Sequence, residues 1–206
     1  MNAATVQALE ALNRAFYETV ADSFDATRGQ PWPGWEPLLD HLRPPLRVLD
    51  VGCGNGRLGV FLAQRTGQAL HYHGIDTSAA LLDRARAALP AAVLEQRDAL
   101  TDLPDAHYDL VALFGVLHHV PGAERRLVFM RALAGRVASG GILAFACWRF
   151  DEYDRFRERY APWPDDWQRE RGDHLLDWRQ GVHALRYCHY VDDAEHAALE
   201  AAAGLD

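Results

Sequence analysis

A run of glycines after residue 50 carries the clearest chemistry in the sequence. Asp50-Val51-Gly52-Cys53-Gly54-Asn55-Gly56 follows a short apolar run and precedes a segment with helical spacing. Glycines at such a junction permit a tight turn and let a ligand approach the backbone, while a helix start presents N–H groups. Gly54–Gly59 also fits the pattern G-x-G-x-x-G, so a dinucleotide ligand stays open at this point. Asp50 favours another ligand, because a carboxylate can bind an ammonium group but has no favourable partner in a pyrophosphate.

Two further acids follow at the ends of the next apolar runs. Asp76, about twenty residues beyond the loop, would accept hydrogen bonds from ribose hydroxyls. Asp98, which follows the third run, would accept one from an adenine amino group. The sequence contains no lysine, which excludes reductases that need a Tyr-x-x-x-Lys pair. These acids therefore favour an adenosyl amino acid as the ligand.

Apolar runs and helical stretches alternate between residues 46 and 147, and these elements would position the acids. Alternation of this kind predicts right-handed crossovers and a parallel sheet covered by helices on both faces. Helices are expected over 5–24, 36–43, 78–89 with Ser78 as N-cap, 122–138, and 192–203, which Gly204 ends. Gly140 and Gly141 are expected to open the fifth strand.

Residues 148–190 differ from the rest in composition. They hold ten aromatic residues, and eight arginines against nine acids. The segment is too aromatic for a linker and too charged for a core. We therefore expect a cap over the carboxyl edge of the sheet, with Trp163, Trp167 and Trp178 in the core of the cap.

The glycine loop, Asp76, Asp98 and the pair His118-His119 after the fourth run occur in an order that resembles the class I S-adenosylmethionine-dependent methyltransferases. The resemblance covers about residues 45–147 and implies a Rossmann-like α/β sheet of strand order 3-2-1-4-5. It implies one domain over 1–206, with an N-terminal helix and entry loop (1–44), a cofactor core (45–147), the aromatic cap (148–190) and a C-terminal helix (191–206). The cofactor S-adenosylmethionine would contact Asp50, Gly52, Cys53, Gly54, Asn55, Gly56, Asp76, Thr77, Asp98, Ala99 and Phe114.

The flanking segments resemble a narrower family, the methyltransferases that esterify 5-carboxymethyluridine at the tRNA wobble position. The matching motifs are Phe24–Pro33, which contains Thr27-Arg28 and Pro31-Trp32-Pro33, then Glu124-Arg125-Arg126, Trp148, and Arg186-Tyr187-Cys188-His189. In the last motif cysteine replaces a tyrosine of the family. The family also continues into a final antiparallel hairpin, whereas this sequence stops at Asp206, so either the chain is trimmed or the sheet ends at an exposed fifth strand.

Methyl transfer from a sulfonium is an in-line displacement, so the protein mainly has to place the acceptor. A carboxylate acceptor needs no general base, and arginine suits its orientation. The resemblance assigns Arg28 and Arg186 as anchors for a carboxylate or phosphate, Tyr187 and His189 as orienting residues, and His118 as a cleft residue. Trp32 and Trp148 would offer faces for base stacking. A salt bridge for Arg28 and a packing role for Trp32 are the structural alternatives.

Composition limits which binding partners are expected but does not identify the molecule that accepts the methyl group. The chain of 206 residues has a net charge of −8, which argues against non-specific binding to nucleic acid. Three cysteines without a disulfide framework predict a reduced cytoplasmic protein, and the spacing of the cysteines and histidines, with no HxxxH pair, predicts no metal site. No membrane segment is expected, because no apolar run approaches the roughly 18 residues that a membrane helix needs. The expected partners are a tRNA anticodon loop and a small activating protein. Two alternatives stay open: methylation of a small-molecule acid or metabolite, and a non-catalytic cofactor-binding module that acts through a partner.

Overall fold

The computed structural model describes residues 1–26, 30–66, 70–180 and 182–205, without the side chains of 21–26 and 180. The chain folds into two compact units. The sheet unit comprises Phe24–Phe114 and Leu133–Phe145, and the hairpin unit comprises Met1–Ser23, Gly115–Ala132 and Ala146–Asp206. The predicted core of residues 45–147 thus corresponds mainly to the sheet unit, while the division of one domain into four parts stays a prediction.

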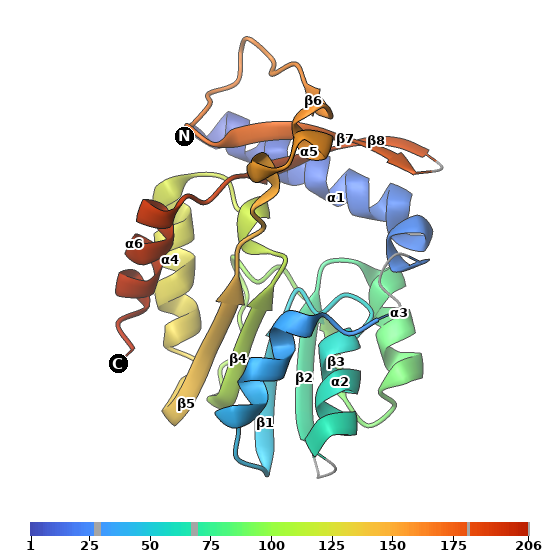
Figure 1. The fold of residues 1–206 in the computed structure, drawn as a ribbon, viewed down its shortest axis with the longest axis vertical. Coiled ribbons are helices and arrows are strands. Elements are labelled where there is room, and N and C mark those ends of the chain that lie inside the picture. The colour runs from blue at the N-terminus through green and yellow to red at the C-terminus, as the bar shows by residue number, and fades with distance from the viewer. Residues whose placement is uncertain (27–29, 67–69, 181, 206) are drawn as a thin grey trace. The chain divides into compact units, whose positions relative to one another are not determined.

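The sheet unit is built on a five-stranded sheet of order β3-β2-β1-β4-β5, which confirms the predicted order (Figure 1). Its strands are β1 (Leu46–Val51), β2 (Leu70–Asp76), β3 (Val93–Gln96), β4 (Tyr108–Phe114) and β5 (Val137–Ala146). β1 pairs in parallel with β2 and β4, and β2 pairs in parallel with β3. Because β1 is central and buried at nearly every position, the loop that follows it starts at the middle of the carboxyl edge.

Helices α2 (Arg57–Thr66) and α3 (Ala79–Ala88) and the 3₁₀ helix η1 (Pro33–Asp40) belong to this unit. Phe61 and Leu62 of α2, Leu82 of α3 and Trp35 of η1 share the hydrophobic core with β1 and β4. Ser78 caps α3 as predicted, since its Oγ accepts a hydrogen bond from the Leu81 N–H. η1 lies earlier than the predicted helix over 36–43, because Pro33 fits a first helical position.

The segment before β5 corrects a sequence prediction. Helix α4 (Ala123–Ala134) ends before residue 138, and β5 starts at Val137, so Gly140 and Gly141 lie inside the strand. Gly140 has φ 73°, and a Cβ at Gly141 would lie 2.9 Å from the Tyr108 carbonyl oxygen. Gly140 therefore serves a left-handed backbone conformation and Gly141 a close backbone approach, and neither marks the start of the strand.

The hairpin unit contains an antiparallel sheet that the sequence analysis missed. It comprises β6 (Tyr160–Ala161), β7 (Asp173–Gln180) and β8 (Val182–His189) in the order β6-β7-β8. The helical elements are α1 (Ala3–Ala26), η2 (Leu117–His119), η3 (Phe150–Glu152), α5 (Asp154–Arg157) and α6 (Asp193–Ala203). α6 follows its prediction, with Asp192 as N-cap and Gly204 left-handed at φ 62°. Among the described residues no hairpin continues the large sheet beyond β5.

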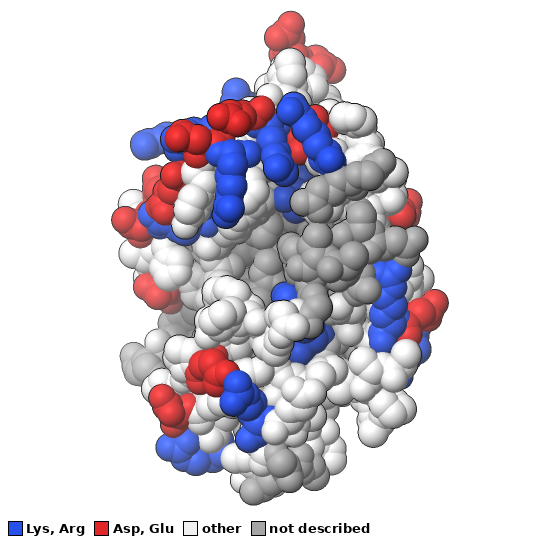
Figure 2. Space-filling model, turned by 45° about the vertical axis from the view of Figure 1, so that its right-hand side comes forward, with Lys and Arg blue, Asp and Glu red and all other residues white. Residues whose placement is uncertain are grey.

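The surface charge is mixed. Basic and acidic side chains are interspersed over the face drawn in Figure 2. Many arginines of the hairpin unit have an acidic neighbour, as in the pairs Arg149–Asp193, Arg157–Asp154 and Arg179–Asp177. None of the described helices is long and apolar enough to cross a membrane.

Candidate functional site

The glycine loop turns directly from β1 into α2. Its three glycines have left-handed φ values that other residues rarely adopt, at 71° for Gly52, 55° for Gly54 and 77° for Gly56. The N–H groups of Gly52 and Cys53 donate to the Ile75 carbonyl at 2.8 and 3.0 Å. The Gly54 N–H donates to Asp76 Oδ2, and the Gly56 N–H donates to the Cys53 carbonyl. Because these N–H groups already have acceptors, the loop is a poor cradle for a pyrophosphate.

Asp76 and Asp98 lie after neighbouring strands, as predicted. Asp76 ends β2 and accepts hydrogen bonds from the N–H groups of Gly54 and Ser78, both at 2.8 Å. Burial raises the pKa of this carboxyl, and the backbone donors offset part of the rise. Asp98 follows β3 and accepts from the Leu100 N–H at 3.0 Å. Each carboxylate is held by the backbone and keeps lone pairs with which it could accept hydroxyl or amino donors.

Asp50 lies in β1 one residue before the loop. It is 4% exposed, and one carboxylate oxygen accepts a hydrogen bond from the Tyr72 hydroxyl of β2. Burial raises the pKa of Asp50 to about 7, with the Tyr72 hydrogen bond acting in the opposite direction. The sequence analysis did not single out Tyr72, because nothing in an apolar strand pattern shows which partner a buried phenol reaches.

An aromatic cluster from the entry segment covers the end of β4. Trp32 and Trp35 lie 5.7 and 6.1 Å from Phe114, measured between ring centroids. Arg57, the first residue of α2, lies over the Trp35 ring and donates a hydrogen bond to the Gln30 carbonyl. Trp32 keeps 42% exposure, so it combines a packing contact with an open face. Arg28 lies outside the described residues.

In the hairpin unit, Arg186 of β8 lies in an enclosure of aromatic rings. Its guanidinium carbon lies 4.6 Å from the Trp148 ring, 5.2 Å from Phe16 and 5.8 Å from Trp178. The residue is 7% exposed, and no carboxylate among the described residues pairs with it. His118 lies 5.5 Å from the Trp148 ring and is buried. The structure therefore brings together three of the predicted acceptor residues, Arg186, Trp148 and His118.

Tyr187 and His189 lie elsewhere, which revises their predicted role. Side chains alternate along a strand, so Arg186 points to one face of β8, and Tyr187 and His189 point to the other. Tyr187 has no exposed surface, and its hydroxyl donates to Asp173 at 2.7 Å. His189 is 2% exposed and hydrogen-bonded at both ring nitrogens, to Asp173 and Glu195. Neither residue offers a free polar atom to an acceptor, so we assign both to support of β8.

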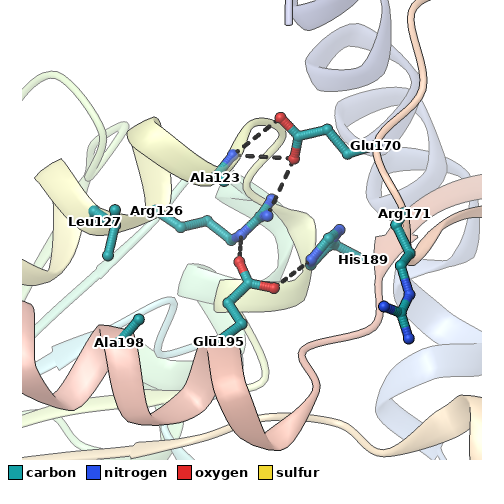
Figure 3. Close-up of a pocket in the computed structure, with 8 residues that line it drawn as sticks. All are labelled: Ala123, Arg126, Leu127, Glu170, Arg171, His189, Glu195 and Ala198. Atoms are coloured by element: carbon teal, nitrogen blue, oxygen red, sulfur yellow. Dashed lines mark hydrogen bonds and ion pairs between the residues drawn. The ribbon is translucent and has the colours of Figure 1, made fainter.

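His189 belongs to an ion network that the sequence analysis also missed (Figure 3). Arg126, 1% exposed, pairs with Glu195 at 2.7 Å and Glu170 at 3.2 Å. Desolvation lowers the pKa of His189, but the hydrogen bonds to Asp173 and Glu195 outweigh it and raise that pKa overall. The network borders a cavity of about 400 Å³. Its charged groups neutralise one another. We call this network a structural tie, meaning a set of ion pairs that holds α4, β8 and α6 together without binding a ligand.

Among the described residues, two groups of side chains have the composition of metal ligands, His118-His119-Cys188 and Glu170-Asp173-His189. In the first, His119 bonds the Tyr187 carbonyl through Nδ1 and the Tyr17 hydroxyl through Nε2. Burial, with the charge of Arg186, lowers the pKa of His119 to about 3. In the second, both nitrogens of His189 are engaged, as described above. The predicted absence of a metal stays a prediction.

Comparison with known proteins agrees with the loop and strand order. Residues 48–141 match the family model described as "Methyltransferase domain". The tRNA (carboxymethyluridine(34)-5-O)-methyltransferase of Saccharomyces cerevisiae is 32% identical over 140 residues, which are 66% of this chain and 47% of that protein. The corresponding ALKBH8 enzyme of Macaca fascicularis is 31% identical over 147 residues, which are 70% of this chain and 21% of that one. The chain therefore spans about half or less of the length of these relatives.

Solved structures show the same fold. CalS10, described as an amino pentose methyltransferase from Micromonospora echinaspora and solved with S-adenosylmethionine, aligns with a TM-score of 0.63 at 24% identity over 90% of this chain and 88% of its own. DhpI, solved with SAM and HEP, aligns with a TM-score of 0.67 at 22% identity over 99% and 91%.

The chain therefore contains a methyltransferase domain of the class I S-adenosylmethionine-dependent family. The residues fit that cofactor, because Asp50, Asp76 and Asp98 lie at or just after the ends of three adjacent strands. Carboxylates in this arrangement suit an ammonium group, ribose hydroxyls and an adenine amino group, while the engaged N–H groups of the loop disfavour a pyrophosphate.

Proposed function

We propose that this protein transfers a methyl group from S-adenosylmethionine to a carboxylate, and that the acceptor is the 5-carboxymethyl group of a tRNA wobble uridine. The observation that carries the carboxylate assignment is Arg186, a cation enclosed by aromatic rings without a carboxylate partner among the described residues. An enclosed guanidinium of this kind favours a planar anion that can accept two hydrogen bonds. The names of the yeast and macaque relatives support the choice of a wobble carboxymethyluridine as the acceptor nucleoside.

The cofactor would supply an electrophilic methyl group on a sulfonium. An oxygen of the acceptor carboxylate would take this methyl group, and the electron pair of the methyl–sulfur bond would stay on sulfur. The products would be a methyl ester and S-adenosylhomocysteine, without transfer of a proton. The task of the chain is placement: Arg186 and Arg28 would hold the acceptor anion, and Trp32 and Trp148 would stack on its base or on a flanking base.

Mass spectrometry of bulk tRNA from cells with and without the protein tests this function. We expect the methyl ester on wobble uridine to disappear with the protein and the free acid to accumulate. Purified protein should regenerate the ester from that tRNA. Unchanged tRNA in both assays would reject the tRNA acceptor.

A small-molecule carboxylic acid or other metabolite is the second candidate. The net charge of −8 and the mixed surface of Figure 2 favour it, because tRNA binding needs several phosphates to be neutralised. A small partner protein that contributes cationic surface would reconcile this charge with a tRNA acceptor. Tight binding of a small acid without salt-dependent tRNA binding would select the second candidate. Cofactor binding without turnover on any acceptor would select the non-catalytic module.

A further inference from the structure

Residues of β1, β2 and α2 surround the contact between Tyr72 and Asp50. Tyr72 is 3% exposed in β2, opposite Val48 of β1, and its hydroxyl donates to an Asp50 oxygen. α2 leaves room for the ring, because a Cβ at Gly59 would lie 2.8 Å from Tyr72 Cε2. A larger residue at position 59 would clash with the Leu89 side chain and with the Tyr72 ring, so glycine here leaves room for the Tyr72–Asp50 contact.

The remaining surroundings of Asp50 compensate its charge only in part. Asp76 at the end of β2 repels a negative charge on Asp50, and Arg57 at the start of α2 attracts it. The buried Cys53 thiol lies in the loop, and β4 presents Ala112 in register with Asp50. The second Asp50 oxygen accepts no hydrogen bond from a described residue. A buried carboxylate with one phenol donor is still short of positive charge, and a ligand cation would supply it.

We propose that Tyr72 is a positioning residue of the cofactor site, which holds Asp50 at the end of β1 so that its second oxygen receives the ammonium group of an adenosyl amino acid. The proposal rests on the cofactor assignment. It has a thermodynamic consequence, because a carboxyl that is half protonated near pH 7 must lose its proton to pair with the ammonium group. Binding of an ammonium-bearing ligand is then coupled to release of a proton from Asp50.

Calorimetry with two ligands tests this on the unmodified protein. S-adenosylhomocysteine carries the ammonium group, and 5′-methylthioadenosine shares the adenosine and thioether but lacks the amino-acid end. We expect the affinity for S-adenosylhomocysteine to rise about tenfold from pH 6 to pH 8, with proton release visible as a buffer-dependent enthalpy, and the affinity for 5′-methylthioadenosine to stay level. Equal pH dependence for both ligands would overturn the proposal. Failure of both to bind would instead overturn the cofactor assignment on which it rests.

Tyr72→Phe removes the hydroxyl and keeps the aromatic ring, so it tests the contribution of the hydroxyl alone. Loss of the phenol donor removes one of the two interactions that lower the Asp50 pKa, the other being the charge of Arg57. The S-adenosylhomocysteine profile should therefore move to higher pH while 5′-methylthioadenosine affinity stays unchanged. Carbon NMR of the ligand-free protein should show the same shift for the Asp50 carboxyl. Tyr108→Phe is the matched control, because Tyr108 is a buried tyrosine of β4 whose hydroxyl pairs with His73. Identical profiles in the two variants would refute the role of Tyr72.

Discussion

The sheet unit and the hairpin unit both bury carboxylates, and the two units differ in what those carboxylates bind. At the carboxyl edge of the large sheet, Asp50 and Asp76 accept from a phenol and from backbone N–H groups, and no arginine or histidine pairs with them among the described residues. In the hairpin unit, Asp173 and Glu195 face His189 and Arg126, so charge meets opposite charge.

This difference separates binding sites from structural ties. The carboxylates without cations lie where ligand groups could bind, an ammonium group at Asp50 and ribose hydroxyls at Asp76. The carboxylates with cations are already paired within the protein. Arg186 shows the reverse situation: it is a buried cation of the hairpin unit without an acid partner among the described residues. Four experiments test whether that distinction holds.

Arg126→Met should have the largest effect, on stability. Removal of a fully buried cation leaves Glu170 and Glu195 without their arginine partner, so we expect the free energy of unfolding to fall by roughly 3 kcal/mol. Chemical denaturation measures it. Arg125→Met is the control, since Arg125 and its partner Glu10 are both partly exposed, in contrast to the buried Arg126. An equal, small loss in both variants would show that the network is not a structural tie.

Arg186→Lys tests the unpaired cation. The substitution keeps the charge but loses the planar fork, so turnover should fall roughly a hundredfold while S-adenosylhomocysteine affinity stays within about twofold. Steady-state kinetics and calorimetry give the two numbers. Arg179→Lys, at an exposed arginine of β7, should change neither. Turnover unaffected by Arg186→Lys would remove the acceptor role and return Arg186 to a packing function.

Asp76→Ala tests the predicted ribose acid of the sheet unit. The affinity for S-adenosylmethionine should fall at least about tenfold, or about 1.4 kcal/mol, because the ribose hydroxyls lose their acceptor. Asp83→Ala, an exposed acid of α3 that pairs with Arg86, is the control. Calorimetry that shows unchanged affinity for Asp76→Ala would refute the ribose role.

The smallest expected effect is the change of folding stability with pH that His189 causes. His189 has a pKa above its ordinary 6.5, so the native state binds its proton more tightly than the unfolded chain does. Its contribution to stability is complete below pH 6.5 and is lost as the pH rises through the higher native pKa. Asp50, raised from 3.8 to about 7, changes stability in the same direction, so the test is the difference between the wild type and His189→Gln. We expect that difference to shrink with rising pH, and a constant difference would contradict the linkage.

Local patterns predicted the parts of this molecule that depend on neighbours in sequence. Ser78 and Gly204 bound their helices as expected, because caps act within one turn. The strand β8 was missed, because apolar and polar residues do not alternate strictly along Val182–His189. Its faces therefore remained unknown, and Arg186 and Tyr187 were assigned to one site although they point apart.

The sequence alone predicted the glycine loop, the acids after it and a parallel sheet, because backbone conformation, strand alternation and crossover handedness are local or general rules. The strand order came from the resemblance to the class I methyltransferases. Only the tertiary structure decided that Tyr72 serves Asp50, that Arg126 ties two acids, and that Arg186 lies among aromatic rings with no acid partner among the described residues. Such pairings join residues far apart in the chain, and their energy depends on burial. Neither the partners nor the burial follow from the order of amino acids without the folded coordinates.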